Sequence, residues 1–311
     1  MSDTPKVSIL FATHNGAKRL RRTMDSLVAQ DFPRQNWELI IVDNASTDDT
    51  SAILSSYGDQ LPLTLVHHAE PGKSKALNAA MHLLQGELIV LTDDDIRAEP
   101  DWLSAFVKCA DTNPDYGIFG GRIIPEWEKE PGKARFLDWI PMGPTFAILD
   151  ETDNGPCTPE RIWGPNTAVR RSVLKPETTR FREDIGPAPL PIYAMGQDTE
   201  MIVRLAKTGA KAYRCGAAAI HHWIPASNVT EIWVQKRGER LGYGIPALFP
   251  ERVPGGPRIG GVPVKVWIES LYWNLRAAAL YPFTNSKLRF WAIWKYYYMR
   301  GLRAGIRRFA A

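Results

Sequence analysis

"LIVLTDDD", residues 88–95, is a run of apolar residues that leads directly into three consecutive aspartates. A short apolar run bounded by polar residues is typical of a strand buried in a parallel sheet. Three adjacent carboxylates repel one another unless a cation lies among them, and Mg²⁺ prefers carboxylate and phosphate oxygens as ligands. The stretch predicts a buried strand that ends in a cation-binding turn. A solvated turn is the alternative for the three aspartates taken alone.

On both sides of this strand, apolar runs alternate with segments of helical periodicity as far as residue 113. Strands are predicted at residues 7–12, 38–42 and 63–67, and helices at residues 17–30, 46–57, 74–84 and 101–113. Strands that alternate with helices indicate βαβ units and a parallel sheet. The first part of the chain is therefore predicted to be of the α/β class.

Polar residues follow three of these strands at the point where each strand ends. They are His14-Asn15 after the first strand, Asp43-Asn44 after the second and Asp93–Asp95 after the fourth. Ligands of open parallel sheets bind beyond the carboxyl ends of the strands. We therefore expect the three clusters to converge on one edge of the sheet and to form a functional site there.

Beyond residue 122 the pattern is less regular. Residues 123–163 are rich in proline with little periodicity, which indicates a long irregular excursion. The segments that follow are a helix start at 168–174, a loop at 181–196, a helix at 197–208 and a strand at 211–220.

Two polar features of this region have more than one interpretation. Asp198 opens the predicted helix, where a carboxylate interacts favourably with the helix dipole whether or not it is functional. His221 and His222 follow the predicted strand, either as polar surface or as ligands of a transition metal such as Mn²⁺. The histidines gain significance only if they lie close to the aspartate cluster.

Charge is distributed unevenly along the chain. The 311 residues are 44% hydrophobic and 23% charged, which excludes disordered and collagen-like proteins. The formal net charge is +4, but residues 231–311 carry +10 and residues 1–230 carry −6. The last 81 residues also hold 15 of the 32 aromatic residues. An acidic body with a basic, aromatic tail indicates a polar site and a separate contact with an anionic surface.

The tail is predicted to form two helices, at residues 264–281 and 286–308, separated by Pro282. Its aromatic and basic side chains suit the headgroup boundary of a membrane with anionic lipids; they include Trp267, Trp273, Trp291, Trp294, Arg300, Arg303, Arg307 and Arg308. Two helices that only pack on the rest of the protein are the alternative. Nucleic acid is not an expected partner, because no known binding module is present.

The start of the chain and its cysteines both bear on the location of the protein. The polar start of the chain predicts no signal peptide, and no run reaches the roughly 18 apolar residues of a spanning helix. Cys109, Cys157 and Cys215 are too few and too scattered for a disulfide framework or a zinc site, and their odd number fits reduced thiols. We therefore expect a cytoplasmic protein, peripheral on the cytoplasmic face of the membrane.

Taken in order, the motifs resemble glycosyltransferase family 2, including its members in bacterial cell-surface polysaccharide and glycolipid synthesis. The matching stretches lie within residues 5–225 and read VSILFATHN, LIIVDNASTDDT, EPGKSKALNAA, GELIVLTDDDIRAEPDWL, WGPNTAVRRSVL, GQDTEMIVRLAKTGAK and AIHHW. The resemblance implies a GT-A fold, which is Rossmann-like, with a catalytic domain over 1–230 and a helical extension over 231–311. Within that domain, about 1–122 would be the nucleotide-sugar half and about 123–230 the acceptor half.

The resemblance also implies roles for residues of the donor site. His14 lies in the first nucleotide loop, Asp43 resembles the carboxylate that hydrogen-bonds the base, typically uracil N3–H, and Lys73 falls near a basic residue that holds the donor. The three aspartates resemble the DxD motif, in which Asp93 or Asp94 reaches the ribose or sugar.

Further along, Asp95 would ligate the metal, and His222 would complete the metal shell better than His221. Gly164 and Asn166 would line the donor sugar and acceptor region, and Asp198 would be the catalytic base.

The implied activity is an inverting transfer of a hexosyl or N-acetylhexosaminyl group, dependent on Mn²⁺ or Mg²⁺. The donor would be a UDP-sugar, and the acceptor a hydroxyl of a glycan or polyprenyl-linked molecule. The Gln-x-x-Arg-Trp element of processive synthases is absent, which favours addition of a single sugar. A catalytically silent sugar-nucleotide-binding or scaffold protein is the alternative. A nucleotidyltransferase would need a glycine-rich phosphate loop after the first strand, which residues 13–16 do not supply.

Overall fold

The structure, a computed structural model, describes residues 5–132, 134–175, 180–283 and 286–309. The first four residues, on which the signal-peptide prediction partly rests, lie outside this set. The chain forms two compact units. The sheet unit comprises Met1–Glu126, Phe146–Glu183 and Asp198–Trp223, and the helical unit comprises Trp127–Thr145, Asp184–Gln197 and Ile224–Ala311.

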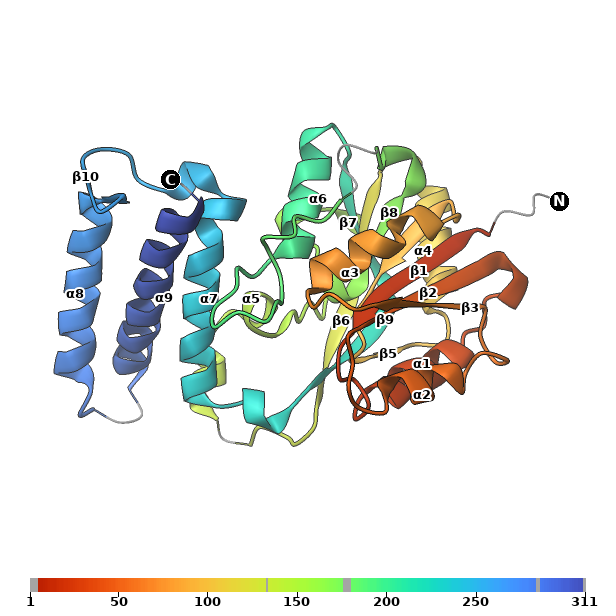
Figure 1. Cartoon of the computed structure of the whole chain (residues 1–311), viewed down its shortest axis with the longest axis horizontal. Coiled ribbons are helices and arrows are strands. Elements are labelled where there is room, and N and C mark those ends of the chain that lie inside the picture. The colour runs from red at the N-terminus through yellow and green to blue at the C-terminus, as the bar shows by residue number, and fades with distance from the viewer. Residues whose placement is uncertain (1–4, 133, 176–179, 284–285, 310–311) are drawn as a thin grey trace. The chain divides into compact units, whose positions relative to one another are not determined.

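The sheet unit is built on one large mixed sheet (Figure 1). Its strands are β1 Val7–Thr13, β2 Trp37–Asn44, β3 Leu63–His68, β4 Leu88–Leu91, β5 Ile96–Ala98, β6 Ile118–Trp127, β7 Gly155–Pro156, β8 Thr167–Arg170 and β9 Ala212–Ile224. Their order is β3-β2-β1-β4-β8-β6-β9-β5, with β7 beside β9. Strands β1 to β4 are parallel, as predicted, whereas β8 runs antiparallel to β4 and β6.

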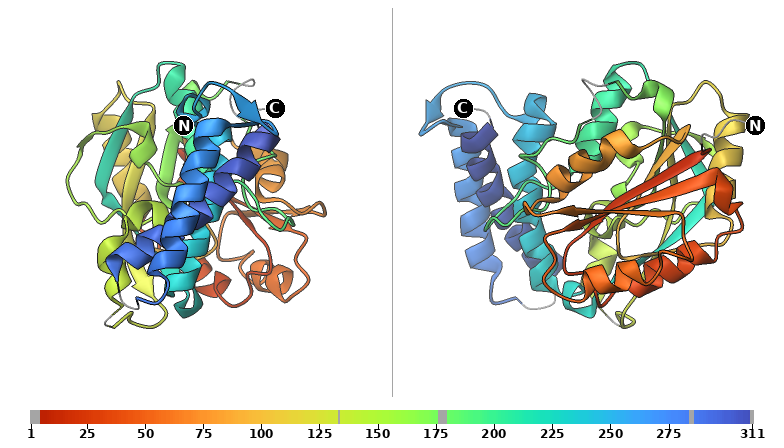
Figure 2. Two further views of the ribbon diagram at one scale, coloured as in Figure 1. Left: turned by 90° about the vertical axis from the view of Figure 1, so that its left-hand side faces the viewer. Right: turned by 45° about the vertical axis from the view of Figure 1, so that its right-hand side comes forward.

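Helices cover both faces of this sheet (Figure 2). They are α1 Leu20–Val28, α2 Thr50–Ser55, α3 Lys73–Ala80, α4 Trp102–Thr112 and α6 Gln197–Lys207, and the short α5 Met142–Phe146 lies in the excursion. Successive residues of a strand point to opposite faces, so Phe11 packs with α1, α2 and α4 while its neighbour Leu10 packs with α3 and α6. Both faces are apolar and buried, and the α/β class is confirmed.

Two local predictions in the second half of this unit are wrong. Residues 168–174 form strand β8 and a 3₁₀ turn, Arg171–Val173, instead of a helix. Pairing with β4 and β6 holds Ala168 and Val169 extended and buried, which outweighs any local helical preference. Strand β9 also continues beyond the predicted residue 220, so His221 and His222 lie within the strand.

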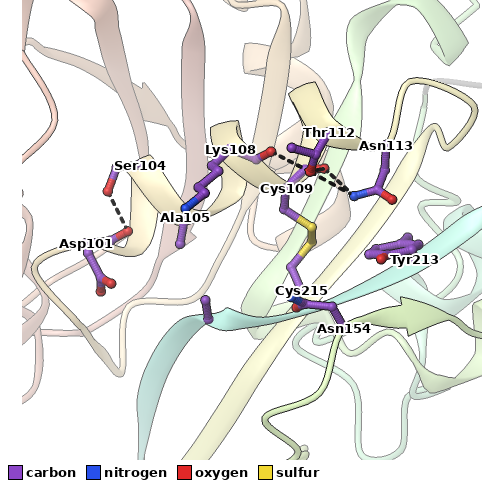
Figure 3. Close-up of a pocket in the computed structure, with 11 residues that line it drawn as sticks. Asp101, Ser104, Ala105, Lys108, Cys109, Thr112, Asn113, Asn154, Tyr213 and Cys215 are labelled. Carbon is purple, nitrogen blue, oxygen red and sulfur yellow. Dashed lines mark hydrogen bonds between the residues drawn. A yellow bond between two sulfur atoms is a disulfide. The ribbon is translucent and has the colours of Figure 1, made fainter.

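The prediction of reduced cysteines is wrong as well. Cys109 on α4 and Cys215 on β9 form a disulfide, and Cys157 is free. Figure 3 shows the disulfide beside a surface pocket lined by α4 and β9. The two cysteines are 106 positions apart in the sequence. Only the packing of α4 against β9 brings them together, so their spacing carried no signal.

The helical unit contains α7 Glu231–Leu248, α8 Val264–Leu280 and α9 Lys287–Phe309, with a hairpin of β10 Arg258–Ile259 and β11 Val262–Pro263 before α8. Helix α9 lies between α7 and α8 (Figures 1 and 2). The two predicted tail helices are confirmed. Among the described helices, we find none that combines the length and the apolar character needed to cross a bilayer.

Helix α7 was not predicted, because it contains glycines and Pro246, which disfavour helices. The glycines allow α7 and α9 to approach at the backbone. A Cβ atom at Gly242 would lie 2.1 Å from the carbonyl oxygen of Tyr298, and one at Gly301 would lie 1.9 Å from that of Glu239. Small residues recur four positions apart on both helices, a spacing known from close helix pairs. Tight packing between the two helices therefore compensates for their low intrinsic helix propensity.

Candidate active site

The candidate site lies at the carboxyl ends of the parallel strands. Thr13, the last residue of β1, is in register with Asp43 on β2, and Leu10 on β1 is in register with Leu91 at the end of β4. The aspartates 93–95 form the turn between β4 and β5. Helices α3 and α6 begin with Lys73 and Gln197. The predicted convergence of polar clusters on one edge of the sheet is confirmed.

Lys73 and Asp93 form an ion pair at this edge, and both side chains are about four-fifths buried. Burial alone would disfavour the ammonium ion, but the negative charges of Asp93 and Asp198 outweigh it and raise the pKa of Lys73 well above its ordinary value. Lys73 is therefore a permanent cation beside two carboxylates. A basic side chain held in this way can bind the phosphates of a donor.

Asp198 occupies the first turn of α6, where the helix dipole favours its charge. Burial nevertheless raises its pKa; the charge of Lys73 opposes this shift and that of Asp93 adds to it. Gly164 lies directly against the carboxylate, since a Cβ at that position would be 2.3 Å from Asp198 Oδ2. The absence of a side chain at Gly164 thus makes room for Asp198. A carboxylate with a raised pKa in a sheltered position suits a general base.

Asp95 and His222 face each other across the site, with 3.6 Å between Asp95 Oδ1 and His222 Nε2. The Nδ1–H of His222 donates to the carbonyl of Phe146 at 2.8 Å, which leaves Nε2 directed at Asp95. Asp95 Oδ1 is buried and accepts no hydrogen bond from the described part of the chain. Burial acts against its charge, but His222 outweighs it and lowers the pKa of Asp95. A carboxylate oxygen close to an oriented imidazole nitrogen is a pair that could hold a divalent metal ion.

The neighbouring His221 points to the other face of the strand. Its Nε2 lies 2.6 Å from Glu99 Oε1, in a chain of charged residues that continues from Glu99 through Arg97 to Glu126. Because side chains alternate along β9, His222 and not His221 faces Asp95. The sequence also favours His222 over His221.

Asp94 is engaged by the protein itself. Arg19 donates to both of its carboxylate oxygens, at 2.9 Å and 2.8 Å, and the Thr13 hydroxyl donates to Oδ2. Asp94 is 7% exposed. Of the two aspartates proposed for the ribose or sugar, Asp93 is partly exposed and paired with Lys73, whereas Asp94 is buried and fixes the turn. Arg19 was missed in the sequence because an arginine that directly precedes a helix has no distinctive pattern.

Asp43 lies near the end of β2, and His14 directly follows β1. The Asp43 carboxylate is buried, accepts from the Ser51 hydroxyl and the Ser46 amide, and lies 3.7 Å from His67 Nδ1. His14 is exposed, and its Nδ1 donates to the Asn44 carbonyl at 2.7 Å. The exposed ring leaves His14 free to contact a planar ligand.

Asn166 lies in the interior of the sheet unit. It is fully buried; its Oδ1 accepts from the Trp102 indole, and its Nδ2 donates to the carbonyls of Arg122 and Ala218, each at 2.8 Å. Both N–H donors are thus used within the protein. Asn166 ties β6 and β9 to α4 through its side chain, and its role beside the donor sugar and acceptor stays a prediction.

The sheet has the topology of the GT-A fold, and aspartates lie at the carboxyl ends of its parallel strands. The protein therefore has a GT-A fold with a C-terminal helical region. It resembles mannosyltransferase PcManGT from Pyrobaculum calidifontis in complex with GDP-Man and Mn²⁺, with a TM-score of 0.62, 21% identity, and 97% of this chain and 87% of that one covered. It also resembles S. aureus TarS 1–349 in complex with UDP-GlcNAc, with a TM-score of 0.58, 15% identity, and coverage of 95% and 90%.

The chain belongs to glycosyl transferase family 2, whose sequence profile matches residues 8–176. A relative from Haloferax volcanii, glucosyl-dolichyl phosphate glucuronosyltransferase, is 29% identical over 54% of each chain. Probable glycosyltransferase YdaM from Bacillus subtilis is 31% identical over 76% of this chain and 54% of its own length. The match therefore spans about half the length of these two relatives.

Proposed function

We propose that the protein transfers a single sugar from a nucleotide-diphosphate sugar to a hydroxyl group, with inversion at the anomeric carbon. The observation that carries this proposal is the convergence of Lys73, Asp93, Asp95, Asp198 and His222 at one edge of the sheet. The sugar is proposed to be a hexosyl or N-acetylhexosaminyl group.

Asp198 is proposed as the general base. Its carboxylate takes the proton of the acceptor hydroxyl while the acceptor oxygen forms a bond to the anomeric carbon and the bond to the diphosphate oxygen breaks. The electrons of the broken bond leave with the nucleotide diphosphate, and the single displacement inverts the configuration. Gly164 supports this role because it leaves space beside the carboxylate.

Mn²⁺ or Mg²⁺ is proposed as the cofactor, held by Asp95 and His222. The unpaired Asp95 Oδ1 fits such an ion, although within the described residues no third His, Cys, Asp or Glu joins the pair. The fit therefore requires donor phosphate oxygens or water as further ligands, which is common for these ions. When bound, the ion would supply Lewis-acid neutralisation of the leaving diphosphate.

The donor is proposed to be a UDP-sugar. Asp43 would accept from the base, His14 would lie against it, Asp93 would reach the ribose or sugar, and Lys73 would bind the diphosphate. The position of Asp43 near the carboxyl end of β2 supports this assignment. Among the similar structures, TarS is seen with UDP and UDP-GlcNAc, whereas PcManGT is seen with GDP-Man.

The acceptor is proposed to be a glycan or polyprenyl-linked molecule in polysaccharide or glycolipid synthesis, which agrees with the name of the Haloferax relative. We propose residues 1–230 as the catalytic domain and residues 231–311 as a membrane-associating extension at the cytoplasmic face. The Cys109–Cys215 disulfide removes the support that the cysteine count gave to this location.

The function can be tested by a donor screen. Thermal shift with nucleotide sugars and Mn²⁺ or Mg²⁺ should identify a stabilising donor, and NMR of the product should show inverted anomeric configuration. Hydrolysis of the donor without acceptor would already distinguish an enzyme from a silent binding protein. Retention of configuration, or binding of donor with neither hydrolysis nor transfer, would overturn the proposal.

A further inference from the structure

Helices α8 and α9 enclose a surface groove within the helical unit. Its volume is about 450 Å³. The residues that line it include Trp267, Ile268, Ser270 and Leu271 on α8 and Met299 and Arg303 on α9. We call it the α8–α9 groove. It combines an apolar wall with a cation, and it contains none of the residues proposed for sugar transfer.

Two cations at the groove, Arg303 and Arg307, have no acidic partner among the described residues, unlike Arg300, which also lines the groove. Arg303 lies over the Trp267 ring at 4.6 Å and Arg307 over the same ring at 5.6 Å. Burial, followed by the like charge of Arg307, lowers the pKa of Arg303. Among the described residues neither arginine forms an ion pair, whereas the nearby Arg300 is balanced by Glu239 at 2.8 Å. The pair of arginines therefore favours an external anion.

A hydroxyl in the groove is also unsatisfied. Ser270 is 6% exposed, and its Oγ has no hydrogen-bond partner among the residues that the structure describes. A buried polar atom without a partner is costly and rare. Because Ser270 lines the same groove as Arg303, a ligand that bears oxygen atoms could satisfy both the hydroxyl and the guanidinium.

The outer face of α8 is apolar and uncovered. Ile268, Leu271 and Leu275 are 64%, 59% and 63% exposed, and Tyr272 between them is 50% exposed. Their spacing of three and four residues places them on one side of the helix. A contiguous exposed stripe of large apolar residues marks an interaction surface. We call these four residues the α8 stripe.

We propose that the α8–α9 groove and the α8 stripe dock on a bilayer of anionic phospholipid, with a headgroup phosphate beside Arg303 and Ser270 and the stripe among the acyl chains. Charge complementarity and the apolar stripe together fit this partner, because an interfacial helix needs both. The inference deepens the membrane association proposed above by naming the surface and the headgroup chemistry. It rests on that association but not on catalysis, since docking needs no sugar donor.

Vesicle flotation of the full chain, without sugar donor, tests this proposal. The protein should float with phosphatidylcholine vesicles that contain phosphatidylglycerol and remain unbound with phosphatidylcholine alone. The double variant Arg303→Glu/Arg307→Glu should lose about tenfold or more in affinity. The variant Leu271→Ser/Leu275→Ser, which changes only exposed side chains, should lose several-fold.

A matched control is Lys108→Glu/Lys211→Glu, the same change in charge at two exposed lysines of the sheet unit. It should bind as wild type, and circular dichroism should show all variants folded. Equal loss in the control, wild-type binding by the groove variants, or equal binding to both vesicles would overturn the inference. So would dimerisation of the chain through the stripe without lipid binding. Sugar transfer to a water-soluble acceptor, measured separately, reports on the proposed function alone.

Discussion

The acidic edge of the sheet and the α8–α9 groove differ in the sign of the ion that each favours. At the edge, Lys73 pairs with Asp93 and Arg19 with Asp94, and a carboxylate oxygen of Asp95 faces His222 without a hydrogen bond from the described residues. In the groove, Arg303 has a like-charged neighbour and an aromatic ring beside it. The first arrangement favours a cation, and the second favours an anion at an apolar surface. The two regions should therefore respond differently to the same perturbations.

The largest expected effect is the loss of transfer in Asp198→Asn. The amide cannot accept the hydroxyl proton, so kcat should fall about a thousandfold or more. Donor affinity, measured by calorimetry, should change little, and vesicle binding should not change. The matched control is Glu200→Gln, two residues further along α6, whose carboxylate is bound to Arg204. Normal turnover by Asp198→Asn would remove this residue from the mechanism.

Removal of divalent metal should have the next largest effect. EDTA should lower transfer about a hundredfold or more, and Mn²⁺ or Mg²⁺ should restore it. Asp95→Asn should weaken metal binding, measured by calorimetry with Mn²⁺ in the presence of nucleotide. The control Asp101→Asn changes an exposed aspartate outside the site. Flotation with anionic vesicles should be the same with and without EDTA. Full transfer activity in chelator would contradict the cation preference assigned to the edge.

Gly301→Ala should destabilise the helical unit by about 3 kcal/mol, because the added methyl group meets the Glu239 carbonyl. Helix propensity alone predicts the opposite sign, since alanine favours helices over glycine. The control Gly255→Ala adds a methyl group with no atom within 4 Å and should leave stability nearly unchanged. Urea unfolding measures both. A more stable Gly301→Ala protein would show that close α7–α9 packing does not hold the groove in place.

The sequence predicted the regions where local pattern and long-range packing agree. The strands β1, β2 and β4 are apolar and buried on both faces, so their pattern reports their position directly. The aspartates 93–95 follow the last of them, and the alternation of a strand selects His222 over His221. The position of the aspartates follows from the parallel topology of β1 to β4, whereas His222 reaches them through the antiparallel pairing of β9 with β5.

The rest depends on partners distant in the chain. Helix α7 is glycine-rich because α9 lies against it, and β8 is a strand because β4 and β6 hold it. Contacts with Trp102, Arg122 and Ala218 use the amide of Asn166, which its local sequence does not reveal. The Cys109–Cys215 disulfide likewise arises from packing. Such pairings are not encoded in local spacing or periodicity.

A smaller effect is expected from pH at the acidic edge. Burial raises the pKa of Asp198, with Lys73 opposing and Asp93 adding to the shift. The base is active as the carboxylate, so kcat/KM should fall about tenfold per pH unit below that raised pKa and level off above it. Vesicle flotation should not follow this curve, because arginine stays charged across the range. An acid limb at the ordinary aspartate pKa of about 3.9 would contradict the shift.

The smallest expected effect separates the two regions by salt. Raising NaCl from about 0.1 M to about 1 M shortens the Debye length from about 10 Å to about 3 Å. Arg307 is exposed, so affinity for anionic vesicles should fall several-fold, and the remainder should depend on Leu271 and Leu275. At the edge, Lys73 and Asp93 are largely buried, so kcat at saturating donor should change less than about twofold. Equal sensitivity of vesicle affinity and kcat to NaCl would mean that one region does not hold its charges as described. The Arg303→Glu/Arg307→Glu variant identifies that region, because its flotation should no longer fall as salt rises.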